Sequence, residues 1–179
     1  MKNCAVILAG GEGKRMKSDK PKTLSEVLGK PMLCWVMSAL RKAGIDDICV
    51  VKGFKKECIE EYLSTLDFSV ESVFQAERLG TGHAVMTQKD ADEETLKINE
   101  VNSGGFWFDC QLLLSVLDRI KSDNSAKEYY LPDAIKLLLE DGRKVGAFTA
   151  QCSDTVLGAN DPAQLEQLNE IARTKGYSC

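Results

Sequence analysis

Short apolar runs and longer amphipathic stretches alternate along the first part of the chain. Runs rich in β-branched residues, with the length of buried strands, occur at residues 4–8, 48–51 and 68–74. Between them, residues 31–43 and 55–66 carry apolar side chains at helical spacing, and Gly44 ends the first of these helices. Strands that alternate with helices predict a mainly parallel sheet with crossover helices, which is an α/β fold.

The later part of the chain predicts a second group of elements. Strands are expected at residues 105–108 and 144–149, and helices at residues 110–120, 131–140 and 162–174, with another helix start at 82–86. Trp107 and Phe108 are expected in the core, because large aromatic side chains are mostly buried. Residues 88–102 are polar and acidic and predict no strand.

The loop after the first predicted strand is unusually rich in glycine and in positive charge. It reads Leu8-Ala9-Gly10-Gly11-Glu12-Gly13-Lys14-Arg15-Met16 and continues to Pro21-Lys22. Glycines without a Cβ let backbone N–H groups approach a phosphate closely. Arg15 can bind two phosphate oxygens at once, and Lys22 adds a point charge. The alternative is a glycine-rich turn whose lysines are merely solvated.

Two familiar phosphate-binding motifs do not fit this loop. A Walker A loop needs Gly-Lys followed by Ser or Thr, whereas Gly13-Lys14 is followed by Arg15. The dinucleotide motif G-x-G-x-x-G begins at Gly11 but has Met16 in place of its last glycine. The loop is therefore of another kind.

Composition and charge restrict the class of protein. Hydrophobic residues make up 44% and charged residues 28%, which is typical of a soluble globular protein. The formal net charge of −4 predicts neither a nucleic-acid partner nor an anionic membrane surface. No apolar run approaches the roughly 18–20 residues of a membrane span. We expect one cytoplasmic domain over residues 1–179; the sequence indicates no oligomeric state.

Cysteine and histidine usage narrows the chemistry further. The chain has seven cysteines, an odd number, and no C-x-x-C spacing, so neither a zinc site nor a disulfide framework is predicted. We expect mostly buried free thiols, as in a reducing cytosol. His83 is the single histidine, which argues against a Ser-His-Asp triad and excludes every mechanism that needs two histidines.

The glycine-rich loop resembles the signature L-x-G-G-x-G-x-R-[ML], followed by P-K, of the sugar-phosphate nucleotidyltransferase family. Within that family the chain is most similar to the bacterial N-acetylglucosamine-1-phosphate uridyltransferases. Other blocks of the same family follow in the same order, at residues 29–33, 75–84, 98–104, 128–133 and 158–161. Together these blocks cover most of the chain.

The resemblance implies a fold, a reaction and a set of partners. The fold would be a Rossmann-like, mainly parallel sheet flanked by helices, of the nucleotide-diphospho-sugar transferase type. The reaction would transfer UMP from UTP to a sugar 1-phosphate, N-acetylglucosamine 1-phosphate, and release pyrophosphate. Such chemistry consists mostly of positioning and charge neutralisation, and Mg²⁺ would be the cofactor. The β-helix acetyltransferase domain of bifunctional relatives would be absent.

The resemblance also implies individual roles. Arg15 and Lys22 would act on the phosphates as catalytic residues, and Asn160 would bind the metal. The implied substrate-binding residues are Leu8, Ala9, Gly10, Gly11, Gln75, Gly80, Thr81 and Asn102. Among them, Gln75, Gly80 and Thr81 would read the uracil edge, and Asn102 would contact the sugar.

The chain departs from the family between Ala84 and Asn102, where relatives carry a much longer stretch. In the relatives, that stretch contains a strand that ends in the motif Gly-Asp-x-Pro-Leu, whose Asp is the second metal ligand. This sequence has no such motif. We therefore expect an internally shortened fold in which residues 105–108 pair directly with residues 4–8, or a sequence from which a segment is missing. Two alternative functions follow: a non-catalytic nucleotide-binding remnant, or a nucleotidyltransferase for another sugar phosphate or molybdopterin.

Overall fold

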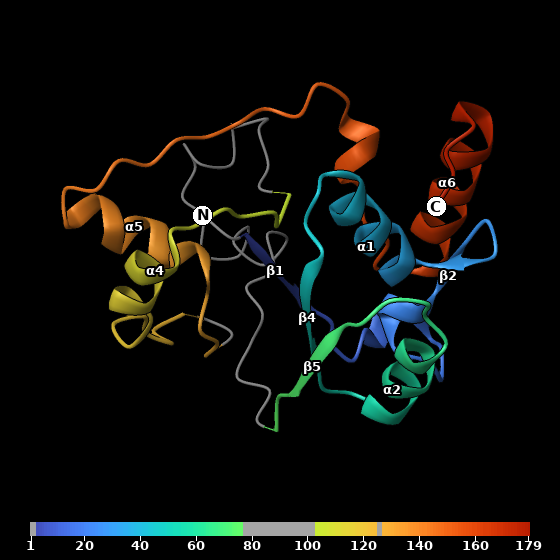
Figure 1. Ribbon diagram of the computed structural model, residues 1–179, viewed down its shortest axis with the longest axis horizontal. Coiled ribbons are helices and arrows are strands. Elements are labelled where there is room, and N and C mark those ends of the chain that lie inside the picture. Colours follow the sequence, from blue (N-terminus) through green and yellow to red (C-terminus); the bar gives the residue numbers. More distant parts are fainter. Residues whose placement is uncertain (1–2, 77–102, 125–126) are drawn as a thin grey trace. The chain divides into compact units, whose positions relative to one another are not determined.

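The computed structural model describes residues 3–76, 103–124 and 127–179. They belong to two compact units (Figure 1). The sheet unit comprises Met1–Arg78 and Leu157–Cys179, and the helical unit comprises Leu79–Val156.

A three-stranded parallel sheet forms the centre of the sheet unit. Its strands lie in the order β1 (Cys4–Leu8), β4 (Asp47–Lys52) and β5 (Glu71–Phe74). Cys4 is opposite Asp47 in the first pair, and Cys49 is opposite Glu71 in the second. The three predicted strands are thereby confirmed, although β5 starts three residues later than the apolar pattern indicated.

The helices α1 (Met32–Lys42) and α2 (Lys56–Ser64) lie on the same side of β4 (Figure 1). Ile48 and Val50 of β4 pack against Leu33 of α1 and Ile59 of α2 in one hydrophobic core. Burial of each such side chain stabilises the fold by about 1.5–3 kcal/mol. Gly44, with φ of +78°, ends α1 as predicted.

The opposite face of the sheet is apolar but exposed. The register places Val6, Cys49 and Val73 on one face, and the exposed fraction is 60% for Val6 and 56% for Val73. Among the described residues, β1 pairs with β4 alone, so its other edge has no strand partner there. The predicted pairing of residues 105–108 with β1 is wrong, because residues 105–108 form no strand.

The remaining elements of the sheet unit are the 3₁₀ turns η1 (Lys14–Met16) and η2 (Lys22–Leu24), the short strands β2 (Glu26–Val27) and β3 (Lys30–Pro31), and α6 (Pro162–Lys175). Asn169 attaches α6 to the β2–β3 hairpin: its Oδ1 accepts from the Leu28 backbone N–H at 2.8 Å. Its Nδ2 donates to the Glu26 carbonyl oxygen at 3.4 Å. The predicted helix 162–174 is confirmed, and it returns the end of the chain to the sheet unit.

The helical unit is built around α4 (Cys110–Leu117) and α5 (Pro132–Glu140), followed by the 3₁₀ turn η4 (Ser153–Val156). Its core consists of Val116, Ile120, Ala134 and Leu138. Asp109 caps α4 by accepting from the Leu112 N–H at 3.0 Å. The predicted helices 110–120 and 131–140 are confirmed within a few residues.

The strands predicted for this unit are wrong. Residues 105–108 and 144–149 are neither strand nor helix, and Trp107 and Phe148 are 71% and 87% exposed. A strand forms only where a neighbour supplies the ladder hydrogen bonds, and no residue described in this unit forms a strand. The expected burial of Trp107 fails with the strand, whereas Phe108 is partly buried against the core of this unit.

The seven cysteines are free thiols, as predicted. Their predicted burial is wrong: Cys4 and Cys110 are exposed, and the other five are half-buried. Of the seven, Cys58 packs against the core of the sheet unit. Within the described residues, none of the helices has the length and apolar character that crossing a membrane requires.

Candidate phosphate-binding site

The glycine-rich loop leaves β1 in close contact with the end of β4. The Ala9 N–H donates to the Val51 carbonyl at 2.8 Å, and the Phe54 N–H donates to the Gly10 carbonyl at 3.0 Å. A Cβ built on Gly10 would lie only 3.0 Å from Oε1 of Gln75. The absence of a side chain at Gly10 therefore brings the loop against Gln75, which follows β5 directly.

Gly53 is a site residue that the sequence analysis did not identify. A Cβ at this position would lie 2.7 Å from the Gly10 carbonyl oxygen and 2.9 Å from the Gly10 Cα. Backbone atoms cannot move aside as a flexible side chain can, so residue 53 must be glycine for the two strand ends to meet. The sequence signal that could have identified Gly53 is its place at the end of a predicted strand, because parallel strands end side by side at one edge of the sheet.

A second close approach folds the loop back onto η2. Gly13 has φ of +63°, and a Cβ there would lie 2.6 Å from Cβ of Lys22. Met16 and Pro21 are buried between these points and hold the loop to the core. The close approaches at Gly10, Gly13 and Gly53 thus make the backbone turn compact, and this turn sets the position of Lys22.

Lys22 and Asn160 are in direct contact although 138 residues separate them. Nζ of Lys22 donates to Oδ1 of Asn160 at 2.6 Å. Asn160 is held at the start of α6, where its N–H donates to Oε1 of Gln164 at 2.8 Å. Asp161, the N-cap of α6, accepts from the N–H of Gln164 at 2.8 Å. The sheet unit therefore brings together two residues for which the resemblance predicted roles.

The electrostatics around Lys22 favour an anion. Burial lowers the pKa of the Lys22 ammonium from its ordinary value, and the nearby charge of Arg15 lowers it further. Arg15 itself is exposed. Two cations that disfavour each other, beside a loop of exposed backbone, are stabilised when a phosphate group binds between them.

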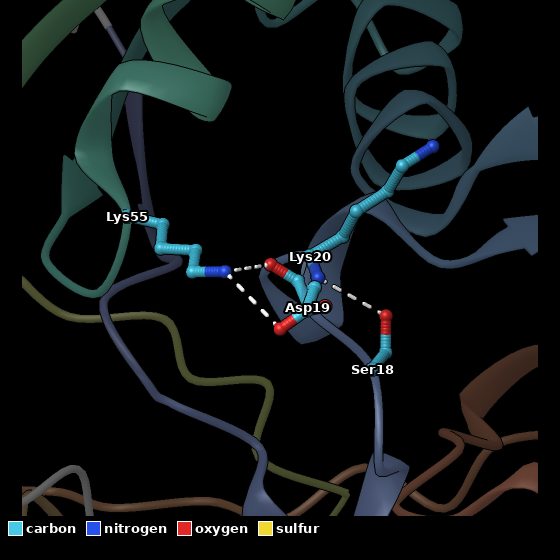
Figure 2. A network of polar contacts seen from close by, with 4 residues as sticks. All are labelled: Ser18, Asp19, Lys20 and Lys55. Atoms are coloured by element: carbon cyan, nitrogen blue, oxygen red, sulfur yellow. Dashed lines mark hydrogen bonds and ion pairs between the residues drawn. The ribbon is translucent and has the colours of Figure 1, made fainter.

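Of the other cations in or near the loop, Lys55 and Lys14 have acidic neighbours. Figure 2 shows Lys55, the residue before α2, reaching Asp19, whose carbonyl oxygen and carboxylate both accept from its Nζ. The Lys20 N–H donates to Oγ of Ser18 at 3.1 Å, while the Lys20 side chain points away from Asp19 (Figure 2). Lys14 is highly exposed, with its Nζ 3.8 Å from Glu12. The Lys55–Asp19 contact braces the loop between η1 and η2.

The described residues do not by themselves form a magnesium site. Asn160 is a single neutral ligand, and its Oδ1 already faces the Lys22 ammonium. Mg²⁺ prefers carboxylate and phosphate oxygens. No group of three His, Cys, Asp or Glu side chains in the described part of the chain could hold a metal ion. The role of Asn160 as a metal ligand stays a prediction.

The candidate residues divide into those that the structure describes and those that it does not. Those described lie in the sheet unit: Leu8, Ala9, Gly10, Gly11, Arg15, Lys22, Gln75 and Asn160. Leu8 and Gly11 are exposed, and Ala9 is fully buried. Gly80, Thr81 and Asn102 lie outside the described residues. The roles assigned to all of them remain predictions.

Comparisons with known proteins agree with this arrangement. A family model described as "MobA-like NTP transferase domain" matches residues 5–94. "Bifunctional protein GlmU" of Clostridium beijerinckii is 34% identical over 244 positions, with 98% of this chain and 53% of the relative covered. The protein of the same name from Clostridium tetani is 33% identical over 245 positions, with the same coverage.

The fold has a counterpart among solved structures. The crystal structure of a UDP-glucose pyrophosphorylase complexed with UDP-glucose matches with a TM-score of 0.68. The match covers 98% of this chain and 100% of that chain, at 16% sequence identity. At this identity the likeness concerns the fold alone, and it confirms the predicted Rossmann-like α/β architecture.

The lengths of the matches bear on the predicted shortening. The chain spans about half the length of the curated relatives it matches. The alignment with the Clostridium beijerinckii protein has 244 positions and this chain has 179 residues, so at least 65 positions face a gap in this chain. The relative therefore carries residues inside the aligned region that this sequence lacks, as the missing Gly-Asp-x-Pro-Leu motif indicated.

Proposed function

We propose that this chain, which belongs to the family of MobA-like nucleoside triphosphate (NTP) transferase domains, transfers UMP from UTP to N-acetylglucosamine 1-phosphate. The reaction would release pyrophosphate. The resemblance of the motif blocks to those of sugar-phosphate nucleotidyltransferases supports a sugar phosphate as the acceptor. We place this activity in the cytoplasm, where UTP is available and thiols stay reduced.

The observation that carries the proposal is the contact between Lys22 and Asn160 beside the glycine-rich loop. In the reaction, a phosphate oxygen of the acceptor attacks the α-phosphorus of the nucleotide, and the bond to pyrophosphate breaks. Negative charge grows on the departing phosphates, and Lys22 and Arg15 would stabilise it. Backbone N–H groups between Gly10 and Gly13 would hold the phosphates in place.

Gln75 supports uracil as the base. Its side-chain amide lies beside Gly10, at the end of the strand next to β4. An amide offers one acceptor and two donors, which match the N3–H donor and O4 acceptor on the uracil edge. An amide can also turn to pair with cytosine, so a panel of nucleotides decides between the two pyrimidines.

A second function is favoured by the shortened sequence. The family resemblance implies a metal ligand within a carboxylate motif. This sequence lacks that motif, and its alignment with the relative has gaps. A chain that keeps the phosphate loop and lacks this ligand would bind nucleotide and transfer it very slowly or not at all. Asp90 and Asp92, in the acidic segment between Ala84 and Asn102, could supply a replacement carboxylate, but they lie outside the described residues.

Pyrophosphate release from UTP and N-acetylglucosamine 1-phosphate tests the proposal. The assay uses protein whose intact mass agrees with 19.7 kDa, so that a longer chain cannot supply the activity. We expect release that depends on both substrates and falls in Lys22→Ala but not in Lys14→Ala. UTP binding without release would favour the second function. Release with another nucleotide or another acceptor would show a nucleotidyltransferase of different specificity.

A further inference from the structure

A pocket of about 430 Å³ lies beside α1, and none of the candidate site residues lines it. Its walls come from α1, from the segment before β5, and from the residues after α6. Cys34 and Ser38 of α1 and Cys179 are among the lining residues. Two thiols that are far apart in the sequence thus line the same pocket.

Backbone geometry directs the residues after α6 toward α1. Gly176, with φ of +67°, ends α6, and the Tyr177 N–H donates to the Ala172 carbonyl at 3.0 Å. The next carbonyl, that of Ser178, accepts from Nζ of Lys42 at 3.2 Å. Lys42 is the last residue of α1, so this contact joins the segment after α6 to that helix.

The two thiols are direct neighbours. The Cys179 side chain contacts both Cys34 and Ser38, which are four residues apart and lie on one face of α1. Cys34 also contacts the Tyr62 hydroxyl of α2. The Cys34 thiol is therefore held between α2 and the residues after α6, and both cysteines are half-buried rather than inaccessible.

We propose that Cys34 and Cys179 are a reversible disulfide site whose oxidant is a small-molecule disulfide, of the class that includes oxidised glutathione. The thiolate of one cysteine attacks a sulfur of the reagent disulfide, whose S–S bond breaks; a mixed disulfide forms and one reagent thiol leaves. The second cysteine then attacks the protein sulfur of the mixed disulfide, and the other reagent thiol leaves. The two protein sulfurs lose two electrons and two protons, and the reagent disulfide gains them as two thiols.

The bond would fasten the end of α6 to α1. The other end of α6 carries Asn160, the residue in contact with Lys22. Burial raises the pKa of Cys179 to about 11, with a further contribution from the neighbouring Cys34 thiol. The Cys179 thiolate is therefore scarce at neutral pH, which makes this thiol a slow nucleophile.

Peptide mapping of the oxidised 179-residue chain tests the site. The protein is incubated with oxidised glutathione, its remaining thiols are blocked, and it is digested with trypsin without reductant. We expect peptide 23–41, which contains Cys34 alone, linked to peptide 176–179, which contains Cys179 alone. The linked species should disappear after dithiothreitol, and in both Cys34→Ser and Cys179→Ser. It should persist in Cys58→Ser, a half-buried thiol of the same unit.

Thermal unfolding gives a second, independent readout. A disulfide across so long a loop should raise the Tm of the oxidised protein by roughly 5–15 °C, with the increase lost on reduction. The increase should be absent in Cys179→Ser. Linkage of peptide 3–14 to peptide 43–52, which would join Cys4 to Cys49, would overturn the proposal. So would disulfides that form only between molecules, or an oxidised chain without the linked peptides.

Discussion

The sheet unit and the helical unit show how differently two parts of one chain can use similar apolar patterns. In the sheet unit, two helices cover a three-stranded sheet, and paired strand ends support a phosphate loop. In the helical unit, two short helices share a smaller core, and apolar residues such as Trp107 and Phe148 stay exposed. The described candidate residues lie in the sheet unit, where neighbouring strands pair and their ends support the loop.

The largest expected effect concerns the core on which the sheet unit depends. Ile59 is fully buried against β4, and Ile59→Ala should lower the free energy of unfolding by about 2–5 kcal/mol. Leu114 in the helical unit is exposed, and Leu114→Ala should change it by less than about 0.5 kcal/mol. Urea unfolding followed by circular dichroism measures both. Similar losses in the two variants would contradict the burial of Ile59 in the core of the sheet unit.

Removal of the site cations should weaken nucleotide binding without unfolding the protein. Arg15→Ala and Lys22→Ala should each remove one of the proposed charge-assisted phosphate contacts, which should cost about 1.5–3 kcal/mol of UTP binding. Lys14→Ala removes an exposed charge of the same loop and should leave the affinity nearly unchanged. Calorimetric titration with UTP compares the three variants. Equal affinity in Lys22→Ala and in the unchanged protein would remove Lys22 from the site.

Gly53 tests whether the site depends on the close approach of strand ends. In Gly53→Ala the new Cβ would meet the backbone of Gly10, and the free energy of unfolding should fall by about 1–3 kcal/mol. UTP affinity should fall as well, because the loop moves. Gly146→Ala in the helical unit is the matched control, since its Cβ would have nothing within 4 Å. A stable Gly53→Ala protein with unchanged affinity would contradict the packing argument.

The smallest expected effect is a dependence on pH. The pKa of Lys22 is lowered in the folded protein, so the unfolded chain binds this proton more tightly. Stability should therefore rise with pH between the lowered pKa and the ordinary value of 10.5. The difference in unfolding free energy between the unchanged protein and Lys22→Met, measured across this window, isolates the contribution. A difference that falls with rising pH would have the wrong sign.

Much of the sheet unit was predictable because its elements follow one another along the chain. The spacing of apolar residues gave β1, α1, β4 and α2 nearly as observed. The contact between Lys22 and Asn160 was not predictable from pattern, since it joins residues 138 positions apart. Family resemblance alone brought Asn160 into consideration. Gly53 was missed because one glycine after a strand does not show which backbone it will meet.

The helical unit was predictable only in part. Its helices were predictable, because a helix satisfies its hydrogen bonds within one segment. Its predicted strands at 105–108 and 144–149 failed, because a strand depends on partners that local pattern cannot supply. Gly80, Thr81 and Asn102 lie outside the described residues, so their implied roles remain predictions.

The central claim is that the sheet unit binds nucleotide phosphates through Lys22 and Arg15. Calorimetric titration of the unmodified chain with UTP tests it most directly, once with Mg²⁺ and once with the metal chelated by EDTA. We expect saturable binding in both conditions, because the described contacts supply cations and backbone N–H groups rather than metal ligands. Absence of UTP binding in both conditions would contradict the account. Binding only with Mg²⁺ would show that a metal, and not the lysine and arginine, holds the phosphates.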